Sequence, residues 1–185
     1  MSSNDLFWSQ DLGPIHLISL NSYSHTDPGS SMYNWLVKDL EAFKQRFASS
    51  EWPPWLVVMM HTPWYNSNLG HLGEATLMKE HMEDLFYYYG VSVVLNGHVH
   101  SYERTTPIYR NRTDVCGPVY LNLGDGGNRE GPYSQWLPGE NGLERPAWSA
   151  FRQGSFGVAE LNVVNASHAE FRRSGREGTC LAEAA

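Results

Sequence analysis

A continuously apolar stretch in the middle of the chain places the strongest constraint on its fold. Residues 55–60 read Trp-Leu-Val-Val-Met-Met and follow Pro53-Pro54. A strand that is apolar at every position is buried on both faces, which is typical of parallel sheets covered by other layers. Because a parallel neighbour must be reached by a crossover connection, the segments that follow should contain a helix.

These following segments predict a helix and then a second buried strand. From about Gly73, the apolar residues that recur at helical spacing are Met78, Met82, Leu85, Phe86 and Tyr89. Gly90 suits the end of this helix, and residues 91–95 read as the next strand. Strand, helix and strand form a βαβ unit, which is almost always right-handed and brings the C-terminal ends of both strands to one edge of the sheet.

The rest of the chain extends this α/β pattern. A second amphipathic helix is predicted with Ser30 or Ser31 as its N-cap, and its apolar residues are Leu36, Leu40, Phe43 and Phe47. Further strands are expected over residues 15–20, 118–123, 157–164 and 169–171, the last two as a hairpin. Residues 129–150 carry no periodic pattern and predict a long surface loop.

Length and composition point to one globular unit. The 185 residues, 41% of them apolar, are enough for one sizeable core, expected over residues 1–174. The end of the chain, residues 175–185, is expected to be a disordered tail and includes one of the two cysteines, Cys180. With Cys116 as the other, the cysteines are too few for a disulfide scaffold.

The charge and the hydropathy exclude some classes of partner. A formal charge of −7 argues against an extended contact with nucleic acid, whose binders concentrate Lys and Arg. The chain has no apolar run of the roughly eighteen residues that a membrane span needs, and residues 1–5 do not read as the start of a signal peptide. Two N-glycosylation sequons begin at Asn111 and Asn165, and they matter if the protein enters the secretory pathway.

Histidines follow both strands of the βαβ unit. His61 comes directly after the first strand, and the sequence Gly97-His98-Val99-His100 follows the second. Residues two apart in extended chain point the same way, and imidazole is the commonest nitrogen ligand of metals. Because ligands bind at the carboxyl ends of parallel strands, His61, His98 and His100 are expected to converge on a metal ion. The alternative is that they are polar residues of strand-end loops without a ligand.

Three blocks of sequence, in this order and at this spacing, closely resemble the purple acid phosphatases. They are Val-Val-Met-Met-His-Thr-Pro-Trp-Tyr-Asn-Ser over residues 57–67, Gly-His-Val-His-Ser-Tyr-Glu-Arg over 97–104 and Gly-Asp-Gly-Gly-Asn over 124–128. These phosphatases belong to the calcineurin-like metallophosphoesterases, and the resemblance covers roughly residues 5–172. It implies a four-layer αββα sandwich of mixed sheets flanked by helices. At its edge the resemblance implies a dinuclear centre, in which iron(III) pairs with zinc, manganese or iron(II) and phosphate monoesters are hydrolysed.

The resemblance also implies roles for individual histidines. His61 and His98 match the family's ligands of the divalent metal, and His100 matches a ligand of the iron. His71 matches the histidine that contacts the substrate phosphate and protonates the leaving group. Plant members often carry a His-His pair there, whereas Gly70 precedes His71 in this chain.

Residues close to these histidines are expected to support the site. Tyr65, with its neighbour Trp64, is expected at the rim of the pocket. Tyr102, Glu103 and Arg104 follow the His-x-His pair and are expected to orient it from behind, although Arg104 equally suits a surface ion pair. Two roles are open for Asp125, which is either a carboxylate that supports the ligands or a turn-stabilising residue between glycines.

Several family motifs are absent from this sequence. The family's other ligands come from an Asp in an earlier strand, a Gly-Asp-x-x-Tyr block and a Gly-Asn-His-Glu block, and the chain contains neither block. The chain is therefore expected to be the C-terminal half of a catalytic domain. The full-length protein is expected to be secreted or vacuolar, to act on small phosphate monoesters, and to bind neither nucleic acid nor membrane. A homodimer is one of its expected assembly states. The alternatives are a catalytically inactive metal-binding or interaction fragment, and a truncated product that is not stable alone.

Overall fold

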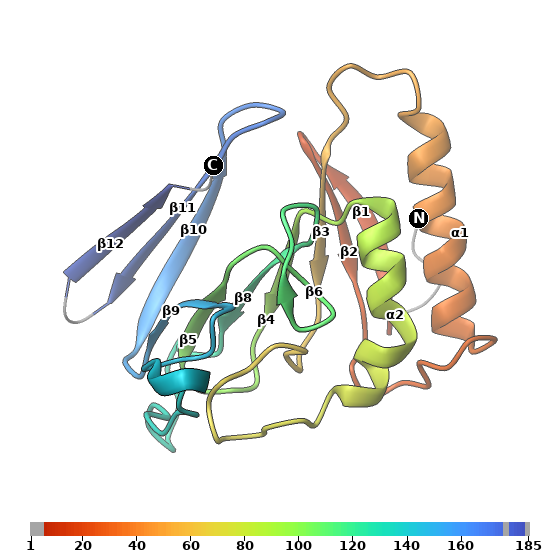
Figure 1. Cartoon of the computed structure of the whole chain (residues 1–185). Coiled ribbons are helices and arrows are strands. Elements are labelled where there is room, and N and C mark those ends of the chain that lie inside the picture. Colours follow the sequence, from red (N-terminus) through yellow and green to blue (C-terminus); the bar gives the residue numbers. More distant parts are fainter. Residues whose placement is uncertain (1–5, 176–177, 184–185) are drawn as a thin grey trace.

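A seven-stranded mixed sheet forms the centre of the computed structural model, which describes residues 6–175 and 178–183 (Figure 1). The strand order is β1-β2-β3-β4-β8-β5-β9. Their bounds are Trp8–Leu12 (β1), Ile15–Ser19 (β2), Trp55–Met59 (β3), Val93–Asn96 (β4), Tyr102–Thr105 (β5), Val119–Leu123 (β8) and Ser149–Gln153 (β9). Strands β2, β3, β4 and β8 are parallel, whereas β1 pairs antiparallel with β2, and β5 with β8 and β9.

The predicted βαβ unit is confirmed. Strands β3 and β4 pair in parallel, with Val58 opposite Val94, and helix α2 (Thr76–Tyr89) connects them. The helix ends at Gly90, whose φ of 72° is the left-handed conformation that glycine adopts without strain. The middle residues of β3 are buried, as expected for a strand covered on both faces. This unit places the two histidine-bearing loops at one edge of the sheet.

Both helices cover the same face of the sheet (Figure 1). Helix α1 (Ser31–Arg46) begins after Ser30, whose hydroxyl accepts a hydrogen bond of 3.3 Å from the N–H of Tyr33, so the predicted cap is confirmed. The buried residues of α1 are Met32, Leu36, Leu40 and Phe43. They pack in one core with Ile18 and Val58 of the sheet and with Met82 and Phe86 of α2. None of the described helices has the length and apolar character needed to cross a membrane.

A second, three-stranded antiparallel sheet lies on the other side of the central sheet (Figure 1). It consists of β10 (Gly157–Val163), β11 (Ala169–Gly175) and β12 (Gly178–Glu183), so the predicted hairpin is confirmed. Phe171 of β11 packs against Val57, Val93 and Leu121 in a second core. The described residues therefore form three layers, namely helices, a mixed sheet and a smaller sheet, in agreement with the expected mixed α/β class.

Several elements differ from the sequence prediction, and β5 and β9 are among the strands that it did not include. Residues 178–183 form β12 where a disordered tail was expected, because the outer edge of β11 offers backbone groups for pairing. Strand β1 was not predicted, because its sequence lacks an alternating apolar pattern and its pairing with β2 stabilises it. The small hairpin of β6 (Ile108–Tyr109) and β7 (Arg112–Thr113) was also missed. The loop over residues 129–150 is as predicted, apart from the short helix η1 (Glu140–Gly142) and the start of β9.

Candidate metal centre

The loops that follow β3 and β4 bring their histidines into contact. Nε2 of His61 lies 2.9 Å from Nδ1 of His98, and the two ring centroids are 4.7 Å apart. His61 follows β3 by two residues, and His98 follows β4 by two residues. The convergence of these two side chains therefore follows from the parallel pairing of their strands.

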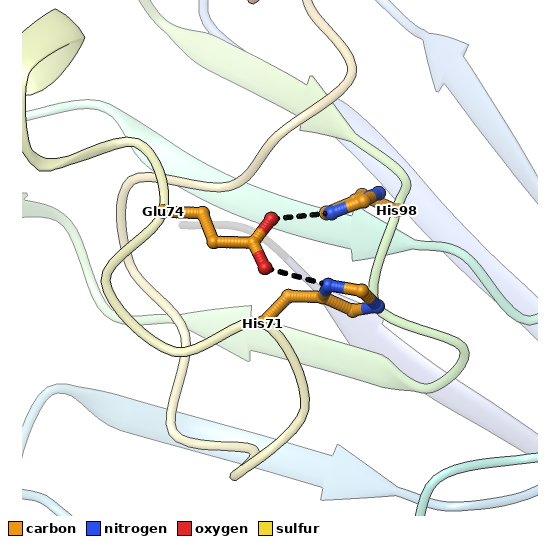
Figure 2. A group of neighbouring side chains, drawn as sticks. All are labelled: His71, Glu74 and His98. Carbon is orange, nitrogen blue, oxygen red and sulfur yellow. Dashed lines mark hydrogen bonds and ion pairs between the residues drawn. The ribbon is translucent and has the colours of Figure 1, made fainter.

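His71 joins this pair from the loop that precedes α2. Its ring centroid lies 3.9 Å from that of His98. The carboxylate of Glu74 links the two rings, since its Oε1 lies 2.8 Å from Nδ1 of His71 and its Oε2 lies 2.8 Å from Nε2 of His98 (Figure 2). Sequence reasoning missed Glu74, and the only available signal was its spacing of three residues from His71 ahead of a helix.

His100 lies at the border of this cluster. Its Nδ1 is 3.3 Å from Oε2 of Glu130, and its ring centroid is 4.7 Å from that of Tyr133. The ring of Tyr133 also lies near His71, at 5.9 Å between centroids. The long loop over residues 129–150 therefore supplies the wall between His71 and His100.

The backbone at two of these histidines adopts an uncommon conformation. His71 has a φ of 56° and His98 a φ of 62°, both in the left-handed region that residues other than glycine seldom occupy. The loop of His98 also packs tightly on Gly124, where an added Cβ would lie 2.0 Å from the carbonyl oxygen of Val99. Strained backbone of this kind gathers at functional sites, where the surrounding structure holds it in place.

The electrostatics of the cluster favour neutral imidazole at His61 and charged carboxylate at Glu74. Burial lowers the pKa of His61, and the positive charges of His98, His71 and His100 lower it further. Hydrogen bonds from His71 and from His98 lower the pKa of Glu74. A metal ion needs the lone pair of a neutral imidazole and an ionised carboxylate, so these groups are ready to bind one.

Donor chemistry identifies the type of ion that fits. Among the described residues, one nitrogen from His71, one from His98 and one oxygen from Glu74 all lie within 4.8 Å of one another. Two imidazoles and one carboxylate suit zinc and similar divalent ions. The residues therefore fit a single divalent cation.

Tyr65 does not line the pocket rim, and that expectation was wrong. Its side chain lies in the main core, 3% exposed, and its hydroxyl donates a short hydrogen bond to Glu83 of α2. Burial and then Glu83 raise the pKa of Tyr65. Trp64 is buried as well and stacks on Phe86 at 4.5 Å between ring centroids. The chain after His61 turns inward over α2, which sequence spacing could not indicate.

The three residues Tyr102, Glu103 and Arg104 make their contacts away from the histidines. They lie in β5, where alternate side chains point to opposite faces. Tyr102 packs on Phe171 in the second core, and Arg104 lines a cavity of about 470 Å³ between the two sheets. Glu103 is buried on the other face and is hydrogen-bonded to serines. The expectation that they orient the His-x-His pair directly is therefore not met.

Asp125 is neither a ligand support nor a simple turn residue. Its side chain is buried and accepts hydrogen bonds of 2.9 Å from Nε and 2.6 Å from Nη2 of Arg173, which is equally buried. This ion pair joins the turn after β8 to β11.

Comparisons with known proteins agree with this geometry. A family model described as calcineurin-like phosphoesterase matches residues 5–102, and one described as iron/zinc purple acid phosphatase-like protein C matches residues 117–175. Purple acid phosphatase 18 of Arabidopsis thaliana is 43% identical over 168 residues, which cover 91% of this chain and 36% of that protein. Probable purple acid phosphatase 20 of the same plant is 42% identical, over 92% of this chain and 38% of that protein.

A solved structure shows the same fold. The structure of a purple acid phosphatase from yellow lupin (Lupinus luteus) seeds superposes with a TM-score of 0.78 and 22% identity, over 96% of this chain and 31% of that chain. The chain thus spans less than two-fifths of the length of these relatives. The two family models together cover most of the described residues, and the curated relatives agree with them. The chain belongs to the calcineurin-like phosphoesterases, and among them to the purple acid phosphatases.

Proposed function

We propose that this chain carries part of the catalytic centre of a metal-dependent acid phosphatase that hydrolyses small phosphate monoesters. The observation that supports the proposal best is the meeting of His61, His71 and His98 at one sheet edge of a purple acid phosphatase chain. A phosphate monoester carries negative charge that must be neutralised in the transition state. This acidic chain gains the needed positive charge locally, from a bound metal.

The metal centre is proposed to be dinuclear in the full-length protein. His61 and His98 would bind the divalent ion, which is zinc, manganese or iron(II), and His100 would bind the iron(III). The described imidazoles fit the divalent half of such a centre. They do not fit the ferric half, because iron(III) favours carboxylate and phenolate oxygens and the sequence lacks the Gly-Asp-x-x-Tyr and Gly-Asn-His-Glu blocks.

His71 is proposed as the general acid. A bound divalent ion supplies Lewis acidity and a water of lowered pKa at such a site. As an imidazolium, His71 would donate its Nε2 proton to the departing alkoxide oxygen, a role typically worth about 10²–10⁴-fold in rate. Glu74 accepts a hydrogen bond from Nδ1–H of His71. This hydrogen bond orients the imidazole ring and leaves its Nε2 free to face the substrate.

The experiment is an aryl phosphate assay on the full-length protein after loading with zinc, alone and together with iron. Activity that falls by about 10²-fold or more in His61→Ala and His98→Ala would support the assignment. His168→Ala is the matched control, because His168 is an exposed histidine in the β10–β11 turn. Full activity in both ligand variants would contradict the proposal.

A non-catalytic metal-binding fragment is the second candidate. Its support is the donor set, in which Glu74 is the carboxylate that joins the histidines His71 and His98. Turnover of the aryl phosphate by the isolated, metal-loaded chain would contradict this candidate.

The full-length protein is further proposed to be secreted or vacuolar and to carry glycans at Asn111 and Asn165. Both side chains are exposed, one in the turn between β6 and β7 and the other in the turn between β10 and β11. An enzyme that transfers or removes N-glycans can reach such turns. A mass shift after glycosidase treatment of the protein from a eukaryotic host, absent in the Asn111→Gln and Asn165→Gln double variant, tests the proposal.

A further inference from the structure

We infer that a pocket beside His71 receives the leaving group of the phosphate monoester, and that Tyr133 selects leaving groups that carry a flat, uncharged ring. This selectivity rests on the proposed phosphatase activity and names the class of ester that the site prefers. The residues that carry it lie in two loops, one before α2 and one after β8.

The pocket has a volume of about 480 Å³, which is in the range of pockets that hold small organic molecules. It is lined by residues 68–71, which end at the proposed general acid, and by residues 132–135 of the long loop. A general acid gives its proton to the oxygen of the leaving group, so the rest of that group must lie close to His71. The pocket borders His71 and has room for it.

Hydrogen bonds hold the two lining segments together. The backbone N–H of Leu69 donates a bond of 2.9 Å to the carbonyl oxygen of Gln135. The side-chain Nδ2 of Asn68, a fully buried residue, donates one of 3.1 Å to the carbonyl oxygen of Tyr133. The pocket is therefore formed before a ligand arrives, and binding does not have to order its walls.

The ring of Tyr133 supplies the aromatic wall of this pocket. Its centroid lies 5.9 Å from that of His71, and the side chain is half-buried. The residue is fixed at both ends, since its backbone N–H donates a bond of 2.8 Å to the carbonyl oxygen of His100 and its hydroxyl donates one of 2.9 Å to Oε2 of Glu130. Aromatic pairs gain energy in stacked and in edge-to-face arrangements, so a fixed ring favours a ligand that also carries one.

Gly70 makes room for the ring of Tyr133. A Cβ at this position would lie 2.5 Å from Cδ2 and 2.9 Å from Cε2 of Tyr133. Gly70 is not among the glycines with left-handed backbone, so glycine is required here for space and not for conformation. The pair of Gly70 and Tyr133 therefore sets the shape of the pocket next to the general acid.

The pocket disfavours a leaving group that carries charge. No Lys, Arg, Asp or Glu is among the described residues that line it. Glu130, bound to the hydroxyl of Tyr133, adds negative charge at its border. Leu69, which is 49% exposed, and Pro132 add apolar surface to the wall. A polyanionic leaving group finds no cation in these walls, whereas an uncharged ring finds apolar and aromatic contacts.

The test compares benzyl phosphate with ethyl phosphate as substrates of the metal-loaded full-length protein. Both esters release an alkoxide, and only benzyl phosphate carries a ring. Tyr133→Ala should lower the ratio of their kcat/KM values, benzyl over ethyl, by about 10-fold, whereas Tyr133→Phe should keep most of it. Because both esters are assayed on the same preparation, an unfolded fraction of a variant does not change the ratio.

Tyr23→Ala is the matched control. The ring of Tyr23 is 72% exposed and also lies near the histidines, at 5.9 Å from His61 between centroids, but it does not line this pocket. The ratio should stay at the wild-type value in this variant. A loss of the ratio in Tyr23→Ala, with the wild-type ratio in Tyr133→Ala, would place the leaving group on the other side of the cluster and overturn the inference.

Gly70→Ala is an independent variant for the same wall. Its Cβ must displace the ring of Tyr133, so the ratio should fall as it does in Tyr133→Ala. In the double variant Gly70→Ala/Tyr133→Ala the ring is already absent, and the ratio should fall no further than in Tyr133→Ala alone. Additive losses would contradict the pairing of the two residues.

Binding of two phosphonates separates the pocket from the activity. In phenethylphosphonate and propylphosphonate a CH₂ group replaces the ester oxygen, so neither compound is hydrolysed. Calorimetry on the full-length protein should show about 10-fold tighter binding of phenethylphosphonate, and Tyr133→Ala should remove this preference. If neither ester is turned over but the preference is present, the proposed activity fails and the pocket stands. Equal or absent binding of the two phosphonates would overturn the inference.

Discussion

The backbone N–H of Ser67 donates a hydrogen bond of 2.8 Å to Glu103, a carboxylate 36 positions later that is 1% exposed. The hydroxyls of Ser67 and Ser149 donate to the same carboxylate. Ser67 belongs to the loop that begins after His61 and ends at His71. Glu103 therefore fastens this loop to β5 and holds the two histidines at their separation, although it touches neither of them.

Removal of the Glu103 carboxylate should destabilise the protein. Glu103→Ala leaves three donors on Ser67 and Ser149 without their acceptor in a buried place, and we expect a loss of about 3 kcal/mol in the free energy of unfolding. Urea denaturation followed by tryptophan fluorescence measures it. Glu103→Gln keeps one acceptor oxygen and the side-chain shape, and it should cost less. Equal losses in both variants would mean that the hydrogen bonds are not the cause.

The buried ion pair of Asp125 and Arg173 should be more important for stability than an exposed pair. Asp125→Ala leaves the Arg173 guanidinium buried without its counter-charge, which typically costs about 3–5 kcal/mol. Glu170→Ala removes the partner of Arg172 on the same strand, where both side chains are exposed, and should cost less than about 1 kcal/mol. Thermal unfolding of the two variants compares them, and similar melting temperatures would contradict this prediction.

The stability of the protein should depend on the protonation of His16. This buried histidine lies 2.6 Å from Asp11 and 2.9 Å from Asp39. Burial lowers the pKa of His16, but hydrogen bonds to Asp39 and then Asp11 outweigh burial, and the net pKa is above 6.5. Its contribution is therefore complete below about pH 6.5 and is lost as the pH rises through the raised pKa.

The carboxylates limit this contribution on the acid side. The hydrogen bond from His16 lowers the pKa of Asp11, so stability is lost again as the pH falls through that lowered pKa. Urea denaturation at a pH of about 5.5 and about 8.5 measures the difference in stability between the two values, to which His16 contributes in favour of the lower pH. His16→Gln should reduce that difference, whereas His25→Gln, in an exposed loop, should keep it. If His16→Gln keeps the full difference in stability between the two pH values, the contacts of His16 with Asp11 and Asp39 are not its cause.

The contact of Gly124 with the His98 loop predicts a contrast between two glycines. Gly124→Ala would place a Cβ 2.0 Å from the carbonyl oxygen of Val99, so the loop must move. We expect a loss of about 1–3 kcal/mol in stability and a weaker affinity for Zn²⁺. Gly126→Ala meets no atom within 4 Å and should change stability by less than about 0.5 kcal/mol. Calorimetric titration with Zn²⁺ measures the affinity of both variants. Equal affinities in Gly124→Ala and Gly126→Ala would contradict a role of the Gly124 contact in holding the His98 loop.

Much of the fold could be predicted from local sequence. The apolar run of β3, the periodic residues of α2 and the glycine at its end specify a βαβ unit, because burial and backbone conformation act over a few residues. The handedness of such units then places His61 and His98 at one edge. The cap of α1 at Ser30 follows from the same local rules.

Other elements of the fold depend on contacts with distant segments, which no local sequence pattern predicts. Strands β1 and β12 lack an alternating pattern and are stabilised by the neighbours to which they pair. The inward turn that buries Tyr65 and the pairing of Asp125 with Arg173 join segments far apart in the chain. Propensity and spacing describe only neighbours in sequence, so these contacts were out of reach.

The metal cluster shows the same division. The sequence by itself determined that the histidines after β3 and β4 converge, since parallel strands end at one edge of a sheet. Only the tertiary structure decided that Glu74 joins His71 to His98 and that His100 turns toward Glu130. The physical reason is that loop conformations, including the left-handed backbone at both His71 and His98, are set by packing against distant residues and not by local pattern.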